Sequence, residues 1–538
     1  MFHAGWRPRA VASLTDLFDL VVIGGGITGA GILLDAAQRG LRVLLLERHD
    51  IASGTSSRSS KLIHGGLRYL KQMQFRITRL ACRERDRMLT LDRHLVRPIR
   101  FLYPALEADR VPGWTVDLGL WMYDRLTTQP QRHTHITPDE LAALAPGISL
   151  DGLERAMVYT DAVADDAALT LAVAATGFAF GGLMLTRAEA LEPLIDGERI
   201  AGVVVRDVES GRTHRVRAHV VVNAAGVWVD KVRDAFGLAG RHVRPSRGSH
   251  VIVSRRTLPL AAAVTLPSPD DGRPVFLVPH PEGVLIGTTD LYHEGPLDDP
   301  RATRGEVAYL LRAVRERFPG RDVTERDVVG AFAGLRPILD THAENPSEAS
   351  REEDIWEERG LLSVAGGKLT TWRVTAAEVV DEAVRHLPED RATIAAQCHT
   401  EGTPLAGTAP PDLADRLRAE TAVAGPIAAA MARRLRALVW WVPRLARDAR
   451  ELEPIAEDVD LTAAEVRVHL RFGAVLRLED FLLRRVRVGL WNPQVARALV
   501  PTLRPLFAEE LGWTSGRWDT EEEAFHWALA AWTPEGVR

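Results

Sequence analysis

The sequence predicts a protein of the α/β class, and three observations carry this prediction. Residues 18–47 follow a strand–helix–strand pattern around a glycine-rich turn, which is typical of a parallel sheet covered by helices. Residues 197–290 hold short apolar runs separated by turn residues, as expected of antiparallel strands. Beyond a proline-rich linker near residues 402–411, the pattern is helical. We therefore expect an α/β part, an antiparallel β part and a C-terminal all-α part.

The first strand and turn have the pattern of a dinucleotide site. The apolar run FDLVVI (18–23) suits a parallel strand buried on both faces. It leads into GGGITG (24–29), which matches G-x-G-x-x-G and opens a helix. In this motif the first glycine makes a tight turn, the second lets the backbone approach a pyrophosphate closely, and the third allows the helix to pack closely. The next strand, LRVLLLE, ends at Glu47, whose carboxylate is placed to accept hydrogen bonds from ribose hydroxyls.

A Rossmann-like domain follows from these features taken together, whereas the glycine motif alone is a weak indication. The alternative is a glycine-rich turn that binds no ligand. The residues of this unit that we expect to contact the cofactor are Gly24, Gly26, Thr28, Gly29 and Glu47.

Two later segments favour FAD over NAD as that cofactor. NAAG (223–226) ends a buried strand and resembles the segment of two-dinucleotide flavoproteins that approaches the flavin. GGKLTT (366–371) begins a helix, whose N-terminus carries free N–H groups and partial positive charge. Aimed at the pyrimidine end of an isoalloxazine, this helix and Lys368 would stabilise the negative charge that appears on reduction. A plain strand-to-helix turn is the alternative for this segment.

Length and composition narrow the class of protein. A chain of 538 residues is expected to form two or three domains. A net charge of −5 gives no reason to expect nucleic acid as a partner. The two cysteines, Cys82 and Cys398, are too few for a disulfide framework, a CxxC pair or a cysteine zinc site. A reducing cytoplasm is the natural compartment, and we predict no metal site.

The uncharged run from Ala167 to Thr186 has about the length of a membrane span. Asp165 and Asp166 precede it in the position of helix caps, and two glycines interrupt it at 181–182. We therefore expect a buried helix, a glycine turn and a strand, and no transmembrane helix. The N-terminal residues lack the apolar stretch and cleavage site of a signal peptide.

Lysine is rare in this chain, although lysine and arginine together number 67. Two of the few lysines, Lys61 and Lys368, lie in glycine-rich motifs. Where arginine is the usual cation, a lysine in such a motif suggests that a compact, titratable ammonium is required.

Several longer strings occur in a distinctive order. They are TSSRSSKLIHGGLRYL (55–70), RGSHVIV (247–253), IGTTD (286–290), GLRP (334–337) and GGKLTTWR (366–373). Together with the glycine motif, they resemble the FAD-dependent glycerol-3-phosphate dehydrogenases, within the superfamily of glycine and D-amino-acid oxidase-like flavoproteins. The resemblance covers about residues 18–380, and SSKLIHGGLRYL is its most specific element.

The resemblance implies FAD as cofactor and an organisation in three domains. The FAD-binding domain would comprise residues 18–90, 151–242 and 330–392, the antiparallel substrate-covering domain 91–150 and 243–329, and the helical domain 405–538. The resemblance also implies oxidation of sn-glycerol 3-phosphate to dihydroxyacetone phosphate, with a membrane quinone as electron acceptor. Such a protein is attached peripherally to the inner face of the cell membrane, and a homodimer is left open.

The matching motifs also imply site residues. Further cofactor contacts would be Thr55, Ser56, Lys61, His64, Gly65, Gly66, Gly226, Gly367, Lys368, Leu369 and Thr370. The substrate pocket would contain Arg68, Tyr69, His250, Arg336 and Lys368.

Two roles in that pocket follow from side-chain chemistry. A guanidinium binds a dianionic phosphate in bidentate fashion without losing its charge, so Arg336 is the first choice for a phosphate clamp and Arg68 the second. Histidine has a suitable pKa for taking the hydroxyl proton, so His250 is the preferred base. Lys368 is its competitor, and would otherwise polarise the substrate oxygen. Without the resemblance, structural arginines and a core histidine would be the ordinary interpretations.

Contact with a membrane follows from the resemblance, and two C-terminal segments have a composition suited to a bilayer interface. ALVWWV (437–442) and FLLRRVRVGLW (481–491) are rich in bulky apolar residues, the second mixed with arginine. Ordinary helix packing with solvated arginines is the alternative explanation.

For the function itself, the alternatives are an oxidase that uses oxygen, a FAD oxidase of amino or hydroxy acids, and a flavoprotein that keeps FAD as a structural part.

Overall fold

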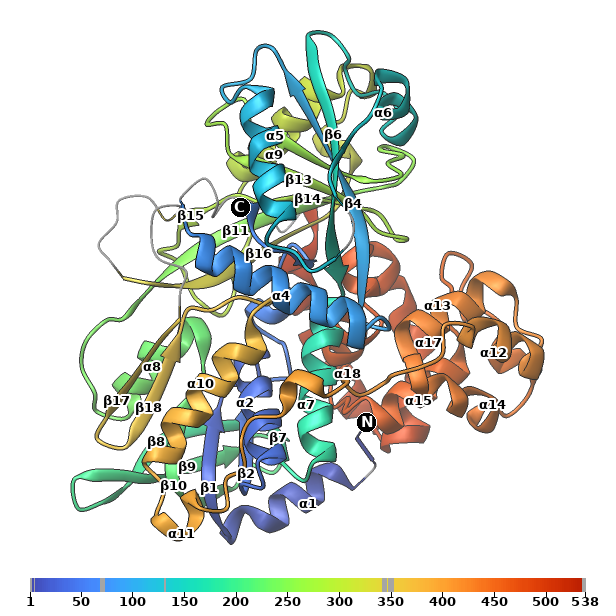
Figure 1. Ribbon diagram of the computed structural model, residues 1–538. Helices are drawn as coiled ribbons and strands as arrows, with labels where there is room; N and C mark the ends of the chain where they lie inside the picture. The colour runs from blue at the N-terminus through green and yellow to red at the C-terminus, as the bar shows by residue number, and fades with distance from the viewer. Residues whose placement is uncertain are drawn as a thin grey trace.

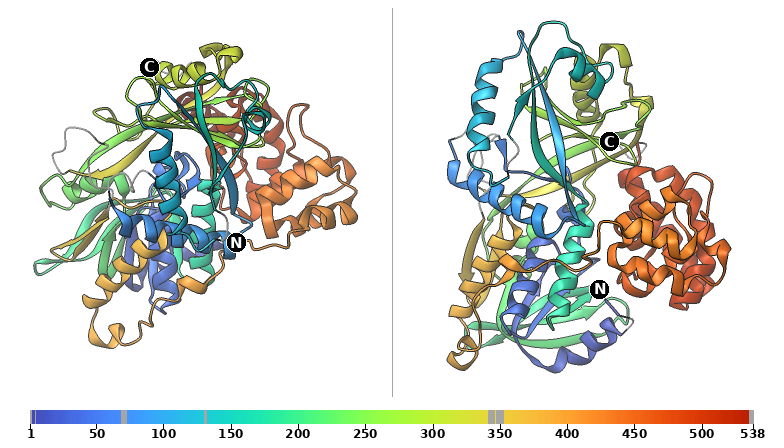
Figure 2. Two further views of the ribbon diagram at one scale, coloured as in Figure 1. Left: turned by 45° about the horizontal axis from the view of Figure 1, so that its top comes forward. Right: turned by 45° about the vertical axis from the view of Figure 1, so that its right-hand side comes forward.

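The computed structural model describes residues 2–3, 5–67, 73–129, 132–340, 346 and 353–534. Figure 1 shows two sheets, one in the lower and one in the upper part of the molecule, with the C-terminal helices packed to one side of them. The three parts are also distinct from the other directions in Figure 2. The predicted α/β class, with an antiparallel second sheet and a C-terminal all-α part, is therefore confirmed.

The first sheet is parallel at its centre, where the strand order is β18–β10–β1–β2–β7. Ile23 at the end of β1 pairs with Asn223 of β10, and Asn223 pairs in turn with Ser363 of β18. Because parallel strands end at the same edge of a sheet, the turns that follow β1, β10 and β18 lie side by side. The strands are β1 (Leu17–Ile23), β2 (Val43–Glu47), β7 (Leu183–Thr186), β10 (Thr213–Asn223) and β18 (Leu361–Ala365).

Antiparallel strands extend this sheet. A hairpin joins β9 to β10, and β8 pairs with β9. On the other side β17 pairs with β18. The bounds are β8 (Ala188–Asp196), β9 (Arg199–Asp207) and β17 (Asp354–Glu358).

Three helices cover one face of the first sheet, with α2 (Ile27–Gln38) between α7 (Asp166–Ala179) and α10 (Trp372–Arg385). The α2–α10 contact is close because a Cβ on Gly31 would lie only 2.9 Å from the side chains of Ala376 and Trp372. The segment 167–186 is a buried helix followed by a turn and β7, as predicted, and Asp165 caps α7 by accepting from the Ala168 N–H at 3.0 Å. Within the described residues, every helix is too short or too polar to cross a membrane.

The second sheet has the order β15–β11–β14–β13–β12–β4–β6–β3, with β16 beside β11 and β5 beside β6. Among the described residues its neighbouring strands are antiparallel except β4 and β12. A hairpin joins β13 to β14. The bounds are β3 (Leu62–Ile63), β4 (Val96–Leu106), β5 (Thr134–His135), β6 (Leu153–Ala164), β11 (Val243–Val253), β12 (Ala263–Pro267), β13 (Pro274–Pro279), β14 (Val284–Gly287), β15 (Leu291–Tyr292) and β16 (Val328–Leu339).

Three strands belong to a different sheet from the one that the expected domain boundaries imply. The boundaries group β3, β6 and β16 with the FAD-binding segments, but all three strands hydrogen-bond within the second sheet. An apolar strand pattern does not indicate which sheet a strand joins, because its partners are distant in sequence. Outside the sheets, the helices of the first 330 residues include α1 (Trp6–Ala12), α4 (Phe75–Leu91), α5 (Gly113–Asp124), α6 (Pro138–Leu144), α8 (Val229–Ala235) and α9 (Arg304–Arg317).

Buried ion pairs attach the C-terminal helices to the rest of the molecule. Asp50 is 1% exposed and accepts two hydrogen bonds of 2.8 Å from Arg485 as well as one from Arg484. Asp166, at the start of α7, lies 3.0 Å from Arg487. The helices are α11 (Glu389–Ala392), α12 (Leu413–Thr421), α13 (Gly425–Leu435), α14 (Val442–Leu445), α15 (Ala463–Phe472), α16 (Val488–Trp491), α17 (Pro493–Leu511) and α18 (Ser515–Leu529).

The two C-terminal segments considered as a membrane surface pack mainly against the rest of the protein, which favours the alternative of ordinary helix packing. In 437–442, Val439 and Val442 are fully buried and only Trp441 is well exposed. In 481–491, the apolar side chains belong to a hydrophobic core, and the arginines are buried in ion pairs. A mixture of arginine and apolar residues fits both a bilayer interface and an ion-paired core. The local sequence cannot distinguish the two, because the acidic partners of the arginines are distant in the chain.

Candidate active site

A cavity of about 890 Å³ lies where the two sheets face each other. Its lower wall contains the turns at the carboxyl ends of β1, β2, β10 and β18, where ligands bind in open α/β sheets. Its upper wall contains residues of β11, β16 and the segments around β13 and β14. Sequence regions from the first to the last strand of the chain therefore meet at one site.

The early glycine turn comes within contact distance of the NAAG segment. Gly24 has a φ of +114°, and a Cβ there would lie 2.5 Å from the Ala224 carbonyl oxygen. A Cβ on Gly29 would lie 1.9 Å from the Gly24 oxygen, so this glycine serves the close approach of α2 to the turn. The Glu47 carboxylate accepts from the Gly25 N–H at 2.6 Å, which holds it beside the turn. The turn thus has the geometry expected of a pyrophosphate and ribose site.

The late glycine turn directly follows β18 and precedes α10. Gly366 and Gly367 both have positive φ angles, of 84° and 78°, which glycine adopts without strain. The Thr370 hydroxyl bonds the main chain of His64, both N–H and carbonyl, at 3.3 Å. Because His64 belongs to the SSKLIHGG string, this contact joins the two longest motifs of the sequence at the cavity wall.

The residues present fit a bound dinucleotide. The glycine turns after β1 and β18 are separated only by β10 and border the same cavity. A side chain at position 24 would collide with the main chain of the NAAG segment, so the close approach of these two segments requires glycine. The acidic acceptor Glu47 lies at one part of the cavity and the α10 N-terminal turn at another, as a cofactor with a ribose end and an electron-accepting ring requires.

His250 lies on β11 in the upper wall and is 2% exposed. Its ring stacks on Phe332, with centroids 4.8 Å apart, and its Nε2 lies 2.8 Å from the Ser60 Oγ. Among the described residues its buried Nδ1 has no hydrogen-bond partner. Burial, together with the charges of Arg336 and Lys61, lowers the pKa of His250 to about 3. The imidazole is therefore neutral near pH 7, which is the state that a proton acceptor has before the reaction.

Arg336 is one of two guanidinium groups held by a single buried carboxylate. Its Nη1 lies 3.1 Å from the Asp290 Oδ1, and Arg273 Nη2 lies 3.0 Å from the Asp290 Oδ2. The Thr288 hydroxyl accepts from Arg336 at 3.2 Å. Both guanidiniums line the cavity, each about a quarter exposed. This part of the wall carries excess positive charge on groups that bind phosphate well.

The structure brings most of the predicted site residues to the cavity. Those that line it are Gly24, Gly26, Thr28, Glu47, Thr55, Ser56, His64, Gly66, Gly226, His250, Arg336, Gly367, Lys368, Leu369 and Thr370. Arg68 and Tyr69 lie outside the described residues.

Gly29, Lys61 and Gly65 lie outside the cavity lining, so the structure does not bring these three predicted cofactor contacts to the site with the others. The Lys61 ammonium is buried against Asp166, 2.9 Å from its Oδ1, and so belongs to the contact with the C-terminal helices. A Cβ on Gly65 would meet Cys82 and Tyr123, at 2.3 and 2.5 Å, so this glycine is required for packing.

Three features of the site were not predicted. Ser60 is the partner of His250, and Arg273 shares Asp290 with Arg336. Helix α5 supplies part of the cavity wall through Leu118 and Met122, among others. Ser60 lies within a recognised string, but nothing in the sequence relates it to a histidine so distant in the chain. The α5 wall has only its apolar composition as a signal.

Comparisons with known proteins agree with this geometry. A model of the family "FAD dependent oxidoreductase" matches residues 19–381, and one described as "C-terminal domain of alpha-glycerophosphate oxidase" matches residues 398–518. The glycerol-3-phosphate dehydrogenase of Mycobacterium leprae is 37% identical over 524 residues, covering 95% of this chain and 88% of that protein. The aerobic glycerol-3-phosphate dehydrogenase of Staphylococcus haemolyticus is 36% identical over 395 residues, covering 72% and 71%.

A solved structure extends the similarity to almost the whole chain. The glycerol-3-phosphate dehydrogenase of Bacillus halodurans, crystallised with FAD, superposes with a TM-score of 0.79 at 28% sequence identity. The superposition covers 99% of this chain and 98% of that one.

Proposed function

The chain belongs to the FAD-dependent oxidoreductases, among the glycerol-3-phosphate dehydrogenases, and we propose that it oxidises sn-glycerol 3-phosphate to dihydroxyacetone phosphate and passes the electrons to a membrane quinone. FAD is its cofactor. The observation that carries the proposal is that both glycine-rich turns, His250 and Arg336 line one cavity. When bound, FAD accepts a hydride from the carbinol carbon of the substrate.

Residues of the lower wall would hold the cofactor along its length. The glycine turn lines the cavity beside the α2 N-terminus, where it would hold the pyrophosphate, and Glu47 would accept from the ribose. Gly367 and Thr370 would support the ring from the α10 side. A helix N-terminus at this place favours negative charge by about 0.3–1 kcal/mol, more when partly buried.

His250 would take the proton of the substrate hydroxyl. A base must be deprotonated before the reaction, and burial holds this imidazole neutral. The hydrogen bond with Ser60 at 2.8 Å and the stacking on Phe332 fix the ring plane. His250 lines the cavity, so its ring is placed beside the space that the substrate would occupy.

Arg336 and Arg273 would bind the phosphate, and Lys368 would polarise the substrate oxygen. Asp290 fixes both guanidiniums from one side, so that no conformational entropy has to be lost there on binding. Lys368 lies on the α10 side of the cavity. A substrate in this cavity would have its phosphate against Arg336 and Arg273 and its hydroxyl beside His250.

Electrons would leave toward the membrane past helix α5. This helix supports the proposal because one of its faces lines the cavity, while Trp114, Leu118 and Trp121 on it are 58%, 48% and 47% exposed. Leu118 belongs to both surfaces, so the cavity opens beside exposed apolar residues. The Arg125 guanidinium lies 4.1 Å from the Trp121 ring centroid. Tryptophan beside a cationic residue is typical of proteins that lie in a bilayer interface.

The acceptor is tested by measuring quinone reduction and peroxide release in the same preparation. With glycerol 3-phosphate in air, the proposal predicts turnover that depends on an added quinone analogue, with hydrogen peroxide a minor product. Stoichiometric peroxide without quinone would instead identify an oxidase.

Attachment to the membrane is tested separately, by sedimentation of the protein with vesicles of anionic and zwitterionic phospholipid. Replacing Trp114 and Trp121 together by serine should release the protein from vesicles while its activity with a water-soluble quinone persists. Trp527→Ser, which alters a tryptophan of α18 that is 65% exposed, is the control and should leave binding unchanged. Equal release by both variants would exclude α5 as the contact.

A further inference from the structure

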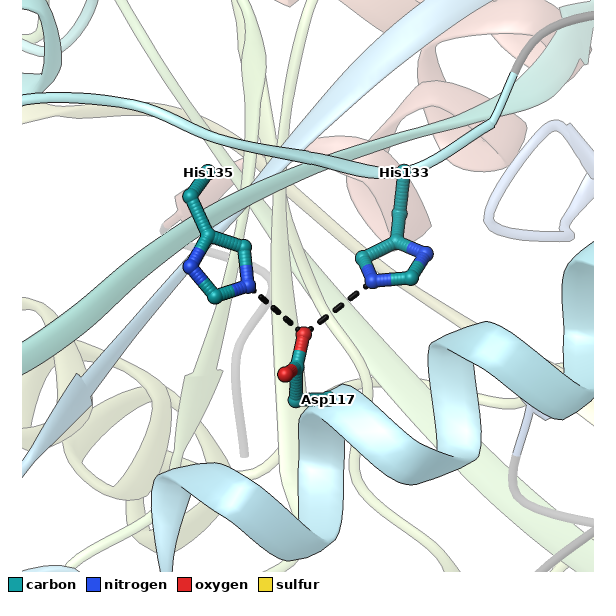
Figure 3. Close-up of side chains that lie close together, drawn as sticks. All are labelled: Asp117, His133 and His135. Carbon is teal, nitrogen blue, oxygen red and sulfur yellow. Dashed lines mark hydrogen bonds and ion pairs between the residues drawn. The ribbon is translucent and has the colours of Figure 1, made fainter.

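A second cluster of functional side chains lies on the outer side of helix α5. Asp117 of α5 faces His133 and His135, which come from the segment leading into and forming β5, as Figure 3 shows. Asp117 Oδ1 lies 3.1 Å from His133 Nε2 and 2.7 Å from His135 Nε2. One atom from each side chain thus lies within 4.8 Å of the other two. Asp117, His133 and His135 all lie outside the lining of the large cavity.

A further carboxylate orients the first histidine. Asp124 lies about two turns after Asp117 on α5. It accepts from His133 Nδ1 at 2.7 Å and from the His133 main-chain N–H at 3.0 Å. A histidine that donates from Nδ1 to a carboxylate and offers Nε2 to a metal is the usual arrangement of histidine ligands. The second carboxylate is therefore placed where a metal site requires it.

The two oxygens of Asp117 have different neighbours. Oδ1 faces the Nε2 atoms of both histidines. Arg155 contacts the other oxygen, Asp117 Oδ2, at 3.3 Å, which leaves Oδ1 for the shared position.

We propose that Asp117 Oδ1, His133 Nε2 and His135 Nε2 bind a Zn²⁺ ion. Two imidazoles and one carboxylate favour Zn²⁺ over Mg²⁺ or Ca²⁺, which take oxygen ligands. With bonds of about 2.0–2.2 Å, tetrahedral ligand atoms lie about 3.3 Å apart, so His133 is close to its position and His135 has to turn slightly outward. His135 is free to do so, since its side chain is 50% exposed. Water from solvent would supply the fourth ligand.

The ion would connect α5 to the second sheet. Asp117 and Asp124 belong to the helix, whereas the histidines belong to the segment that pairs through β5 with β6. Leu118 and Met122 of the same helix form part of the cavity wall. Zn²⁺ at this site would therefore hold in place the helix beside the cavity opening, without entering the chemistry of the cavity.

Zinc binding by the untagged, FAD-loaded chain tests the proposal, with the metal content after dialysis and calorimetric titration with Zn²⁺ as readouts. We expect one Zn²⁺ per chain and a rise in Tm when it binds. His135→Gln and Asp117→Asn should each abolish this uptake. Asp124→Asn, which alters the orienting carboxylate, should weaken Zn²⁺ binding by about 10–100-fold. Since these residues lie outside the cavity, the absorbance of bound FAD should be the same in all variants.

His386→Gln is the matched control, because His386 lies 3.2 Å from Glu382 as a single histidine–carboxylate pair on α10. It should bind Zn²⁺ as the wild type does. Wild-type protein that takes up no zinc would overturn the proposal and leave a protonated His133 shared between two carboxylates. Uptake that survives both His135→Gln and Asp117→Asn would overturn it as well, by placing the metal elsewhere.

Discussion

Ser60 and His250, separated by 190 positions in the chain, meet through a 2.8 Å contact between the serine Oγ and the histidine Nε2. Ser60 lies just before β3, in the string that also holds Thr55 and Ser56 of the cavity lining, and His250 lies on β11. The contact therefore holds the proposed base against that string.

Replacing the proposed base should slow the chemical step rather than weaken substrate binding. His250→Ala is expected to lower the rate of flavin bleaching at saturating glycerol 3-phosphate by about 10²–10⁴-fold, the usual contribution of a general base. Stopped-flow absorbance measures this rate. His293→Ala, outside the cavity lining, should react like the wild type. A His250→Ala rate near that of the wild type would transfer the role to Lys368 or to water.

The phosphate clamp should distinguish arginine from lysine. Arg336→Lys keeps the charge but loses the planar fork that binds phosphate and Asp290 together. We expect KM for glycerol 3-phosphate to rise by about 10–100-fold, which corresponds to one charged hydrogen bond. Arg326→Lys changes an exposed arginine outside the cavity and should leave KM unaltered. An unchanged KM for Arg336→Lys would assign phosphate binding to other residues.

The early part of the site could be predicted because it is local in sequence. The turn at Gly24, the helix after it and the acidic end of β2 at Glu47 all follow from a strand–helix–strand pattern within 30 residues. The late turn at Gly367 was recognised by its motif, and its position beside the early one follows from the strand order of the sheet.

The remaining features depend on contacts that no local pattern encodes. Lys61 lies in a motif expected to contact the cofactor, yet its ammonium binds Asp166, which is 105 positions away. Arg484 and Arg485 were expected at a surface because their acidic partner, Asp50, lies at the other end of the chain. For the same reason Arg273 was missed, since Asp290 connects it to Arg336 only in three dimensions.

The ion pairs of Asp50 should be essential for attachment of the C-terminal helices. Asp50→Ala removes the carboxylate that two buried arginines share, although Arg484 keeps its contact with Asp480. We expect the free energy of unfolding in urea to fall by about 3–5 kcal/mol. Asp16→Asn, which removes an exposed pair with Arg42, should cost less than about 1 kcal/mol. Equal losses from the two variants would mean that the buried network contributes nothing beyond a surface pair.

Stability should fall on acidification because buried histidines resist protonation. Burial, with smaller contributions from Lys61 and Arg97, lowers the pKa of His280 to about 3, against about 6.5 in the unfolded chain. Between these values the unfolded chain binds more protons, so stability rises with pH by up to about 1.4 kcal/mol per pH unit for one such histidine. Urea unfolding from pH 4 to 6.5 should show a shallower slope for His280→Asn than for the wild type. Identical slopes would contradict this assignment.

The central claim is that this cavity holds FAD and oxidises a phosphorylated polyol within it. Anaerobic titration of the yellow protein with glycerol 3-phosphate, followed by absorbance and by assay of dihydroxyacetone phosphate, tests it most directly. We predict that the flavin bleaches with one equivalent of substrate per FAD, that dihydroxyacetone phosphate forms in the same amount, and that glycerol leaves the spectrum unchanged. A spectrum that glycerol 3-phosphate does not alter, or that glycerol alters equally, would contradict the account.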